Sequence, residues 1–183
     1  MIFDIQFVKS SDITPSQANQ LASLNAECFG DVPTIERTDN FIAEPFGYLL
    51  ATIGETLVSR TALFKRDLVF TSTKIVVGGI GGVCVARDYR HHGIASSMVK
   101  RAITVLQKES CDVACLSVDI TKKVFKLYEK LGFKLMEREF SFENVRGDIV
   151  RESGTMFIAL DSPEKYDLIM NSKETFHYGR GCW

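Results

Sequence analysis

Residues 83–95 read Val83-Cys84-Val85-Ala86-Arg87-Asp88-Tyr89-Arg90-His91-His92-Gly93-Ile94-Ala95. An apolar run ends here in a short polar turn, and the pattern Arg-x-x-Gly-x-Ala then opens a segment with helical periodicity. The start of a helix exposes backbone N–H groups and carries roughly half a positive charge, which suits a phosphate or pyrophosphate. Gly93 lets a ligand approach the backbone, Ala95 leaves the first turn uncrowded, and Arg90 adds a positive charge. The stretch predicts a strand–turn–helix unit that binds a phosphate group.

The length and composition predict one cytoplasmic domain. The chain has 183 residues, of which 45% are hydrophobic and 25% charged, as in ordinary globular proteins. It contains no apolar run of the ~18 residues that a membrane span needs, and its first residues do not resemble a signal peptide. Five cysteines without a C-x-x-C pair indicate free thiols in a reducing compartment. We expect a core over 1–160 and a polar tail over 161–183.

Charge is distributed unevenly along the chain, although the net charge is only −1. Residues 1–55 hold eight acids and two bases, residues 56–108 hold two acids and nine bases, and the remainder holds thirteen acids and eleven bases. A basic middle section fits an anionic cofactor, and an acidic front fits a cationic acceptor. The near-zero net charge argues against a nucleic-acid partner.

Hydrophobic patterning predicts a mixed α/β sheet. A helix should begin at Pro15 with Thr14 as its cap and end near Gly30. The Gly78–Gly82 cluster inside a strand suggests a bulge or a close backbone approach. The other expected elements are strands near 2–8, 47–53, 56–70, 74–86, 113–118, 133–142 and 154–160, helices over 93–109 and 121–131, and a helix or loop over 33–45.

Two motifs resemble the signatures of the GNAT superfamily of N-acetyltransferases. Arg90–Ala95 matches the pattern [Q/R]-x-x-G-x-[G/A] after a strand and before a helix, and 127–133 reads Leu-Tyr-Glu-Lys-Leu-Gly-Phe. The resemblance implies the α/β GNAT fold. That fold is a mixed, mostly antiparallel, twisted sheet of six to seven strands, splayed at its central strands and flanked by helices.

The resemblance also implies acetyl-CoA as the acyl donor. The backbone of Val83, Cys84 and Val85 would pair with the pantetheine arm, and Tyr128 would protonate the departing sulfur. Transfer of an acyl group from a thioester to an amine leaves a thiolate, and a nearby phenol can supply its proton. The pyrophosphate would be bound by the backbone of the turn and first helical residues, Arg90, His91, His92, Gly93, Ile94 and Ala95. No zinc-type ligand spacing is present, so no metal is expected.

A closer resemblance is to the aminoglycoside 2′-N-acetyltransferases. It rests on the corner Cys28–Asp31, the run Gly82–Arg90, the strand Gly154–Ile158 and a final tryptophan. It implies a small cationic amine as the acceptor, because carboxylates near the site would bind ammonium groups. The acceptor residues implied are Asp31, Gly82, Asp119, Glu152 and the terminal Trp183. The tail over 161–183 would then reach the acceptor site.

Two acids of that family are replaced by glycine here, at Gly81 and Gly181. The general base is therefore left open between Asp119, His177, the carboxylate of Trp183 and ordered water. The acceptor is likewise open to another amino sugar, a polyamine or a protein amine, and the donor to a longer acyl chain. A CoA-binding module without turnover is a further alternative. For the oligomeric state, a homodimer is one candidate.

Overall fold

A computed structural model describes residues 2–30 and 39–183. The helices are α1 (Pro15–Phe29), α3 (Ile94–Lys108), α4 (Phe125–Lys130) and α5 (Pro163–Asn171), with 3-10 turns η1 (Ser10–Asp12) and η2 (Arg87–Tyr89). The strands are β1 (Asp4–Lys9), β2 (Gly47–Ile53), β3 (Thr56–Phe70), β4 (Thr73–Val85), β5 (Val113–Ser117), β6 (Lys134–Leu135), β7 (Phe140–Glu143), β8 (Ile149–Glu152), β9 (Thr155–Ala159) and β10 (Phe176–Arg180).

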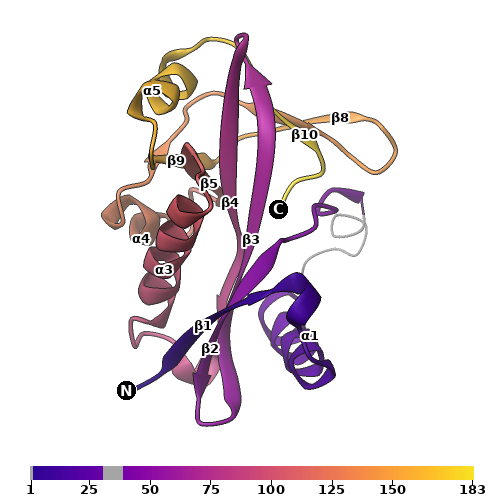
Figure 1. Ribbon diagram of the computed structural model, residues 1–183, viewed down its shortest axis with the longest axis vertical. Helices are drawn as coiled ribbons and strands as arrows, with labels where there is room; N and C mark the ends of the chain where they lie inside the picture. The colour runs from indigo at the N-terminus through magenta and orange to yellow at the C-terminus, as the bar shows by residue number, and fades with distance from the viewer. Residues whose placement is uncertain (1, 31–38) are drawn as a thin grey trace.

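Seven of the described strands form the main sheet, in the order β1-β2-β3-β4-β5-β9-β6. Neighbouring strands are antiparallel except for the β4–β5 pair, which is parallel. Figure 1 shows α3 and α4 on one side of the long β3–β4 pair, with α1 and the chain's C-terminal end on the other. The predicted mixed, mostly antiparallel sheet with flanking helices is confirmed.

Adjacent glycines of β4 show how closely both layers approach the sheet. A Cβ added to Gly78 would lie 2.9 Å from the methyl carbons of Leu106 on α3, and one on Gly79 would lie 2.6 Å from Nε1 of Trp183. Neighbouring residues of a strand point to opposite faces. Helix α3 therefore packs on one face of β4, and the C-terminal residues pack on the other. The close approach predicted from the glycine cluster is confirmed.

The same cluster contains a β-bulge. The β3–β4 register shifts between Arg60 and Ala62, which pair with Cys84 and Gly81 respectively. Gly82 lies in this irregularity with a φ of +54°, a conformation that L side chains rarely adopt. The predicted bulge is therefore present at the end of β4, just before the turn that leads to α3.

The start of α1 also follows the prediction. The Thr14 side chain accepts a hydrogen bond from the Gln17 N–H, and the Gln17 side chain accepts one from the Thr14 N–H. Pro15 occupies the first helical position. These features satisfy donors that a helix start would leave unpaired.

The prediction of a polar tail over 161–183 is wrong. This segment contains α5 and β10, and β10 joins β7 and β8 in a separate sheet of the described chain, with the order β10-β7-β8. Phe176 and Tyr178 alternate with polar residues and are 0% and 2% exposed. Pro163 begins α5 at its first turn. The charged residues between these positions hid a period-two strand signal, because an amphipathic strand has the mean composition of a polar segment.

Other boundaries differ from the prediction in the same half of the chain. The expected helix over 121–131 is limited to Phe125–Lys130, because residues 119–122 form a turn in which Lys122 N–H donates to the Asp119 carbonyl. The expected strand over 133–142 is divided into β6 and β7, which belong to different sheets.

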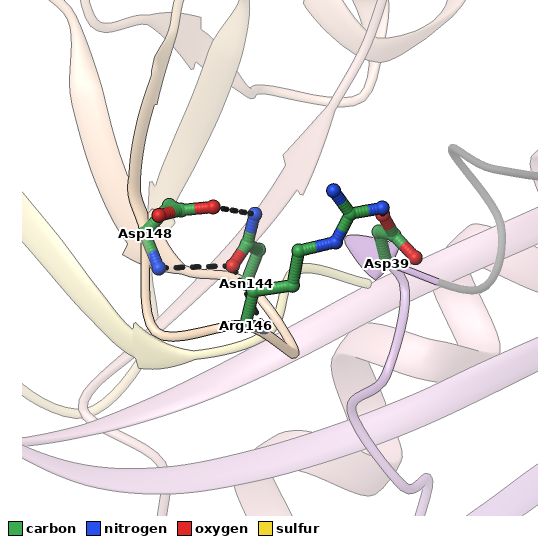
Figure 2. Close-up of polar contacts among 4 residues, drawn as sticks. All are labelled: Asp39, Asn144, Arg146 and Asp148. Atoms are coloured by element: carbon green, nitrogen blue, oxygen red, sulfur yellow. Dashed lines mark hydrogen bonds and ion pairs between the residues drawn. The ribbon is translucent and has the colours of Figure 1, made fainter.

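The β7–β8 turn is fixed by side chains, as Figure 2 shows. The Asn144 Oδ1 accepts from the N–H groups of Arg146 and Asp148, at 2.9 and 3.0 Å. The Arg146 guanidinium reaches out of the turn to the Asp39 carboxylate, at 2.6 Å. A backbone hydrogen bond, from the Val145 N–H to the Asp39 carbonyl, joins the same two segments as this ion pair. The second sheet is thus attached to the segment that precedes β2.

A buried carboxylate attaches α5 to the main sheet. Asp112 is 8% exposed. It accepts hydrogen bonds from the Val76 N–H at 2.7 Å, from the Lys165 ammonium at 2.8 Å and from the Ser162 hydroxyl. Burial by itself would raise the pKa of Asp112, but these hydrogen bonds outweigh it and lower the pKa below its usual value.

We expect Asp112→Asn to lower the free energy of unfolding at pH 7 by about 2 kcal/mol, since bonds to a charged group are lost. Because the folded pKa of Asp112 is depressed, its contribution is present above the unfolded pKa of about 3.9 and is lost as pH falls through the folded pKa. Denaturant unfolding at pH 7 and near pH 3 should show a gap between wild type and variant that narrows on acidification. The exposed Asp167→Asn on α5 is the control, and a gap independent of pH would contradict a role for the charge.

Candidate active site

The two central strands of the main sheet separate partway along their length. β4 pairs with β5 only through Val77, Gly78 and Gly79, although β4 continues to Val85. In the described parts of the chain, the β5 side of β4 has no strand partner beyond Gly79. An unpaired strand edge is a template for another extended chain. The predicted splay is confirmed, and the backbone of 83–85 lies along it.

The turn after β4 leads to a start of α3 that has no side-chain cap. Its N-cap residue is Gly93, with a φ of +78°. Residues 91–93 are exposed, and a Cβ added at Gly93 would have nothing within 4 Å. The N–H groups of the first turn are therefore accessible to an anionic ligand. This geometry fits the pyrophosphate of a coenzyme A molecule.

Arg90 ties this turn to the end of β4. Its Nε donates to the Val85 carbonyl at 3.0 Å, and the Cys28 thiol of α1 lies 3.7 Å from the same oxygen. The N–H of Arg87 donates to the Glu27 carboxylate, a second link to α1. Arg90 is predicted to contact the phosphate. In the structure its Nε also positions the turn, through the hydrogen bond to Val85.

Tyr128 is buried in the apolar core that lies under both parts of this site. It is 7% exposed and belongs to the core cluster that contains Ile80 and Val85 of the open half of β4 and Ile94 of the first turn of α3. Burial raises the pKa of Tyr128 to about 12. The phenol is thus protonated at neutral pH and can donate a proton.

The opposite face of β4 is covered by the Trp183 indole. A Cβ added at Gly81 would lie 3.5 Å from Cβ of Trp183 and 2.9 Å from the Phe64 ring. The indole stacks on Phe64 with ring centroids 5.5 Å apart and planes inclined by 15°. Where the resemblance would place a strand carboxylate, this chain has a glycine beneath an aromatic pair.

Arg66 clamps the C-terminal residues against this face. Its guanidinium donates to the carbonyls of Tyr178, Arg180 and Gly181, the last at 2.9 Å. It also lies over the Trp183 ring, 4.9 Å from the centroid. Burial lowers the pKa of Arg66, although it stays a cation at any neutral pH. All these interactions hold the indole in place.

A second arginine, Arg60, lies over the bulge itself. A Cβ added at Gly82 would lie 2.6 Å from Cζ of Arg60, so glycine is required for the guanidinium to occupy this position. The Arg60 Nε donates to the Asn25 Oδ1 at 2.7 Å, and Cζ lies 5.2 Å from the centroid of the Phe29 ring. Arg60 is half-buried between α1 and the end of β4.

The other predicted site residues lie in several places. Asp31 is outside the described residues. Asp119 is exposed and accepts hydrogen bonds from the hydroxyl and N–H of Thr121, at 2.7 and 2.9 Å, which lower its pKa. A lowered pKa makes a carboxylate a weaker proton acceptor.

Glu152 and His177 belong to the second sheet. Glu152 is half-buried on β8, and its charge adds to the effect of burial in raising the pKa of Cys182 to about 12. Glu152 therefore lies near the residue that precedes Trp183. His177 is exposed on β10, with Nδ1 at 3.0 Å from the Ser141 hydroxyl.

Sequence reasoning missed both arginines of this face. One signal could have indicated them: Arg60 and Arg66 lie in β3, a strand whose buried positions are otherwise largely apolar. An arginine in such a strand needs a partner for its charge. The sequence does not identify that partner, because Asn25, Gly82 and the C-terminal carbonyls are distant along the chain.

Within the described residues, no helix has the length and apolarity needed to cross a membrane. The same residues contain no group of three or more His, Cys, Asp or Glu side chains placed to bind a metal.

Comparison with known families decides the classification. The model of the family described as "Acetyltransferase (GNAT) domain" matches residues 9–136, more than half of the chain. The chain belongs to the GNAT acetyltransferase family. The predicted fold is thereby confirmed, and the open edge of β4 and the uncapped start of α3 are compatible with acetyl-CoA as the acyl donor.

Among curated proteins, this GNAT chain is similar to N-alpha-acetyltransferase 30 of Saccharomyces cerevisiae, with 39% identity over 72 residues. The matched region is 39% of this chain and 41% of the yeast protein. The human protein of the same name is 39% identical over 66 residues, which are 36% of this chain and 18% of that protein. The match thus spans less than half the length of either relative.

Solved structures share the fold. The GNAT family N-acetyltransferase YhbS from Escherichia coli in complex with CoA has a TM-score of 0.62 at 16% identity, covering 97% of this chain and 89% of that one. A chain of the NatC complex bound to Gag peptide and CoA has a TM-score of 0.57 at 19% identity, covering 86% and 99%. At these identities the likeness concerns the fold alone.

We expect Gly93→Ala to weaken CoA binding about tenfold in a calorimetric titration. Its φ of +78° costs an alanine roughly 1–2 kcal/mol, and the new methyl group would stand at the anion-accessible helix start. Gly147→Ala is the matched control, because Gly147 has a φ of +88° and equally open surroundings, but in the β7–β8 turn. Both variants should lose similar thermal stability, and equal loss of CoA affinity in both would contradict the assignment.

Proposed function

We propose that this GNAT chain transfers the acetyl group of acetyl-CoA to the α-amine at the N-terminus of a polypeptide. The observation that supports the donor site is the unpaired edge of β4 beside an uncapped start of α3. The observation that supports the acceptor is the 39% identity with N-alpha-acetyltransferase 30. A protein amine was one of the acceptors that the sequence left open.

The ionisation of the acceptor amine agrees with this proposal. An α-amine has a pKa near 8, whereas a lysine amine has one near 10.4. An appreciable fraction of α-amines is therefore neutral at pH 7–8 without a strong base. The hydrogen bonds that lower the pKa of Asp119 make it a weak base, which suits an acceptor of this kind. Ordered water can then take the proton that the amine loses.

Acetyl-CoA, when bound, supplies a thioester: the amine nitrogen forms a bond to the acetyl carbon, and the carbon–sulfur bond breaks. The backbone of 83–85 would orient the donor, and one of its N–H groups would polarise the acetyl carbonyl. Tyr128 would give its hydroxyl proton to the departing sulfur. Burial raises the pKa of Tyr128 to about 12, so the hydroxyl carries its proton at neutral pH.

An aminoglycoside 2′-amine is a second candidate acceptor. In its favour, the Glu152 carboxylate lies near Cys182, the residue that precedes Trp183. A final tryptophan is one of the features that this chain shares with the aminoglycoside enzymes. Against it, the cations Arg60 and Arg66 lie over Gly82 and over the Trp183 ring, on the face of β4 where the acceptor is proposed to bind, and they would repel a polyvalent cation. A small cationic substrate and a homodimer both stay predictions.

An acceptor panel separates the two candidates. Thiol release from acetyl-CoA should be measured with peptides of free N-terminus, the same peptides with a blocked N-terminus, aminoglycosides and polyamines, and mass spectrometry should locate the acetyl group. We expect the free peptides to be acetylated at the α-amine and the blocked ones, even with lysine present, to be inert. Acetylation of aminoglycosides alone would overturn the proposal.

We expect Tyr128→Phe to lower kcat by about 10²-fold while the KM for acetyl-CoA changes little, because only proton donation to the sulfur is lost. Tyr166→Phe, a half-buried tyrosine on α5, is the control. The loss should be uniform from pH 6 to pH 9, since the wild-type phenol stays protonated in this range. Full activity of Tyr128→Phe at every pH would show that another group protonates the sulfur.

A further inference from the structure

Arg60 differs from Arg66 in how its charge is satisfied. The terminal nitrogens of Arg66 donate hydrogen bonds to three carbonyls of the C-terminal segment. Arg60 donates from Nε to the neutral Asn25 side chain, and its described contacts leave Nη1 and Nη2 over the Gly82 bulge. None of the ion pairs among residues 2–30 and 39–183 includes Arg60.

A half-buried guanidinium without an anionic partner is costly, because it loses hydration without a compensating charge. Its contact with the Phe29 ring, at 5.2 Å, recovers only a part of that loss. The two terminal nitrogens of a guanidinium form a fork that matches a carboxylate. The position therefore has the chemistry of an anion site that no carboxylate of the described residues fills.

The location of this fork connects it to the acceptor. Gly82 immediately precedes Val83, where the open edge of β4 would hold the donor, and Trp183 covers Gly79 and Gly81 just upstream. The glycine at 82 is what allows the guanidinium to lie against the strand, since any Cβ there would collide with it. The Arg60 guanidinium, the Trp183 indole and the glycines of β4 thus line one face of this strand, beside the position where the donor is proposed to bind.

We propose that Arg60 is a specificity-determining residue that binds an acidic side chain of the acceptor, close to the amine that is acetylated. This inference rests on the proposed function, because it takes the acceptor to be a polypeptide N-terminus. The preferred substrates are N-termini with Asp or Glu among their first residues. Lysine-rich N-termini are disfavoured by the same charge.

The test uses three peptides that differ only at their second and third residues, which are both Glu, both Gln or both Lys. For the wild-type protein, kcat/KM should be about tenfold higher for the Glu peptide than for the isosteric Gln peptide, and lowest for the Lys peptide. Arg60→Gln should abolish the preference for Glu over Gln. Arg60→Lys keeps the charge without the fork, so a reduced preference should persist.

Arg101→Gln on the exposed face of α3 is the matched control and should keep the full preference. CoA titration and thermal unfolding of each variant show whether the fold is intact, because Arg60 also contacts α1. A purely structural role would lower the rates of all three peptides by the same factor and leave the ratio unchanged. That result, or equal wild-type rates for Glu and Gln, overturns this inference alone. Absence of turnover with every peptide overturns the proposed function together with it.

Discussion

The active site depends on one constraint, which is that β4 stops pairing with β5 after Gly79 while it continues to pair with β3 as far as Val85. A strand that is paired on one edge and open on the other offers backbone donors and acceptors to an extended ligand, and no described strand pairs with β4 there. The apolar cluster beneath it, which includes Ile80, Ile94 and Tyr128, keeps the open strand, the helix start and the phenol in a fixed relation. The proposed donor site is thus formed mainly by backbone groups.

The opposite face of β4, where we propose that the acceptor binds, is built by side chains from distant parts of the chain. Trp183 comes from the C-terminal segment, Arg60 from β3, and Asn25 and Phe29 from α1. None of them is fixed by local sequence. A fold can be shared while the side chains on this face differ, which agrees with TM-scores of 0.57 and 0.62 to proteins that are 19% and 16% identical.

This difference between local backbone features and a face built from distant segments explains which parts of the structure could be predicted from the sequence. The strand–turn–helix unit, the Thr14 cap and the glycine bulge are local features, and the structure contains them where the pattern placed them. The second sheet was missed because its strands are short and come from separated segments, so that β10 looked like part of a polar tail. The resemblance to aminoglycoside enzymes indicated acids at the acceptor site, whereas the described face of β4 is dominated by two arginines and an indole.

The packing of Trp183 on Gly79 and Gly81 also restricts how this sequence can change over time. A Cβ at position 81 would lie 2.9 Å from the Phe64 ring and 3.2 Å from the carbonyl carbon of Trp183, so a larger residue there has to displace the ring that stacks on the indole. Residues that share a contact do not contribute independently to stability, so the effect of a side chain at position 81 depends on the residue at position 64. The two positions therefore have to be read together when this face of β4 is compared between related sequences.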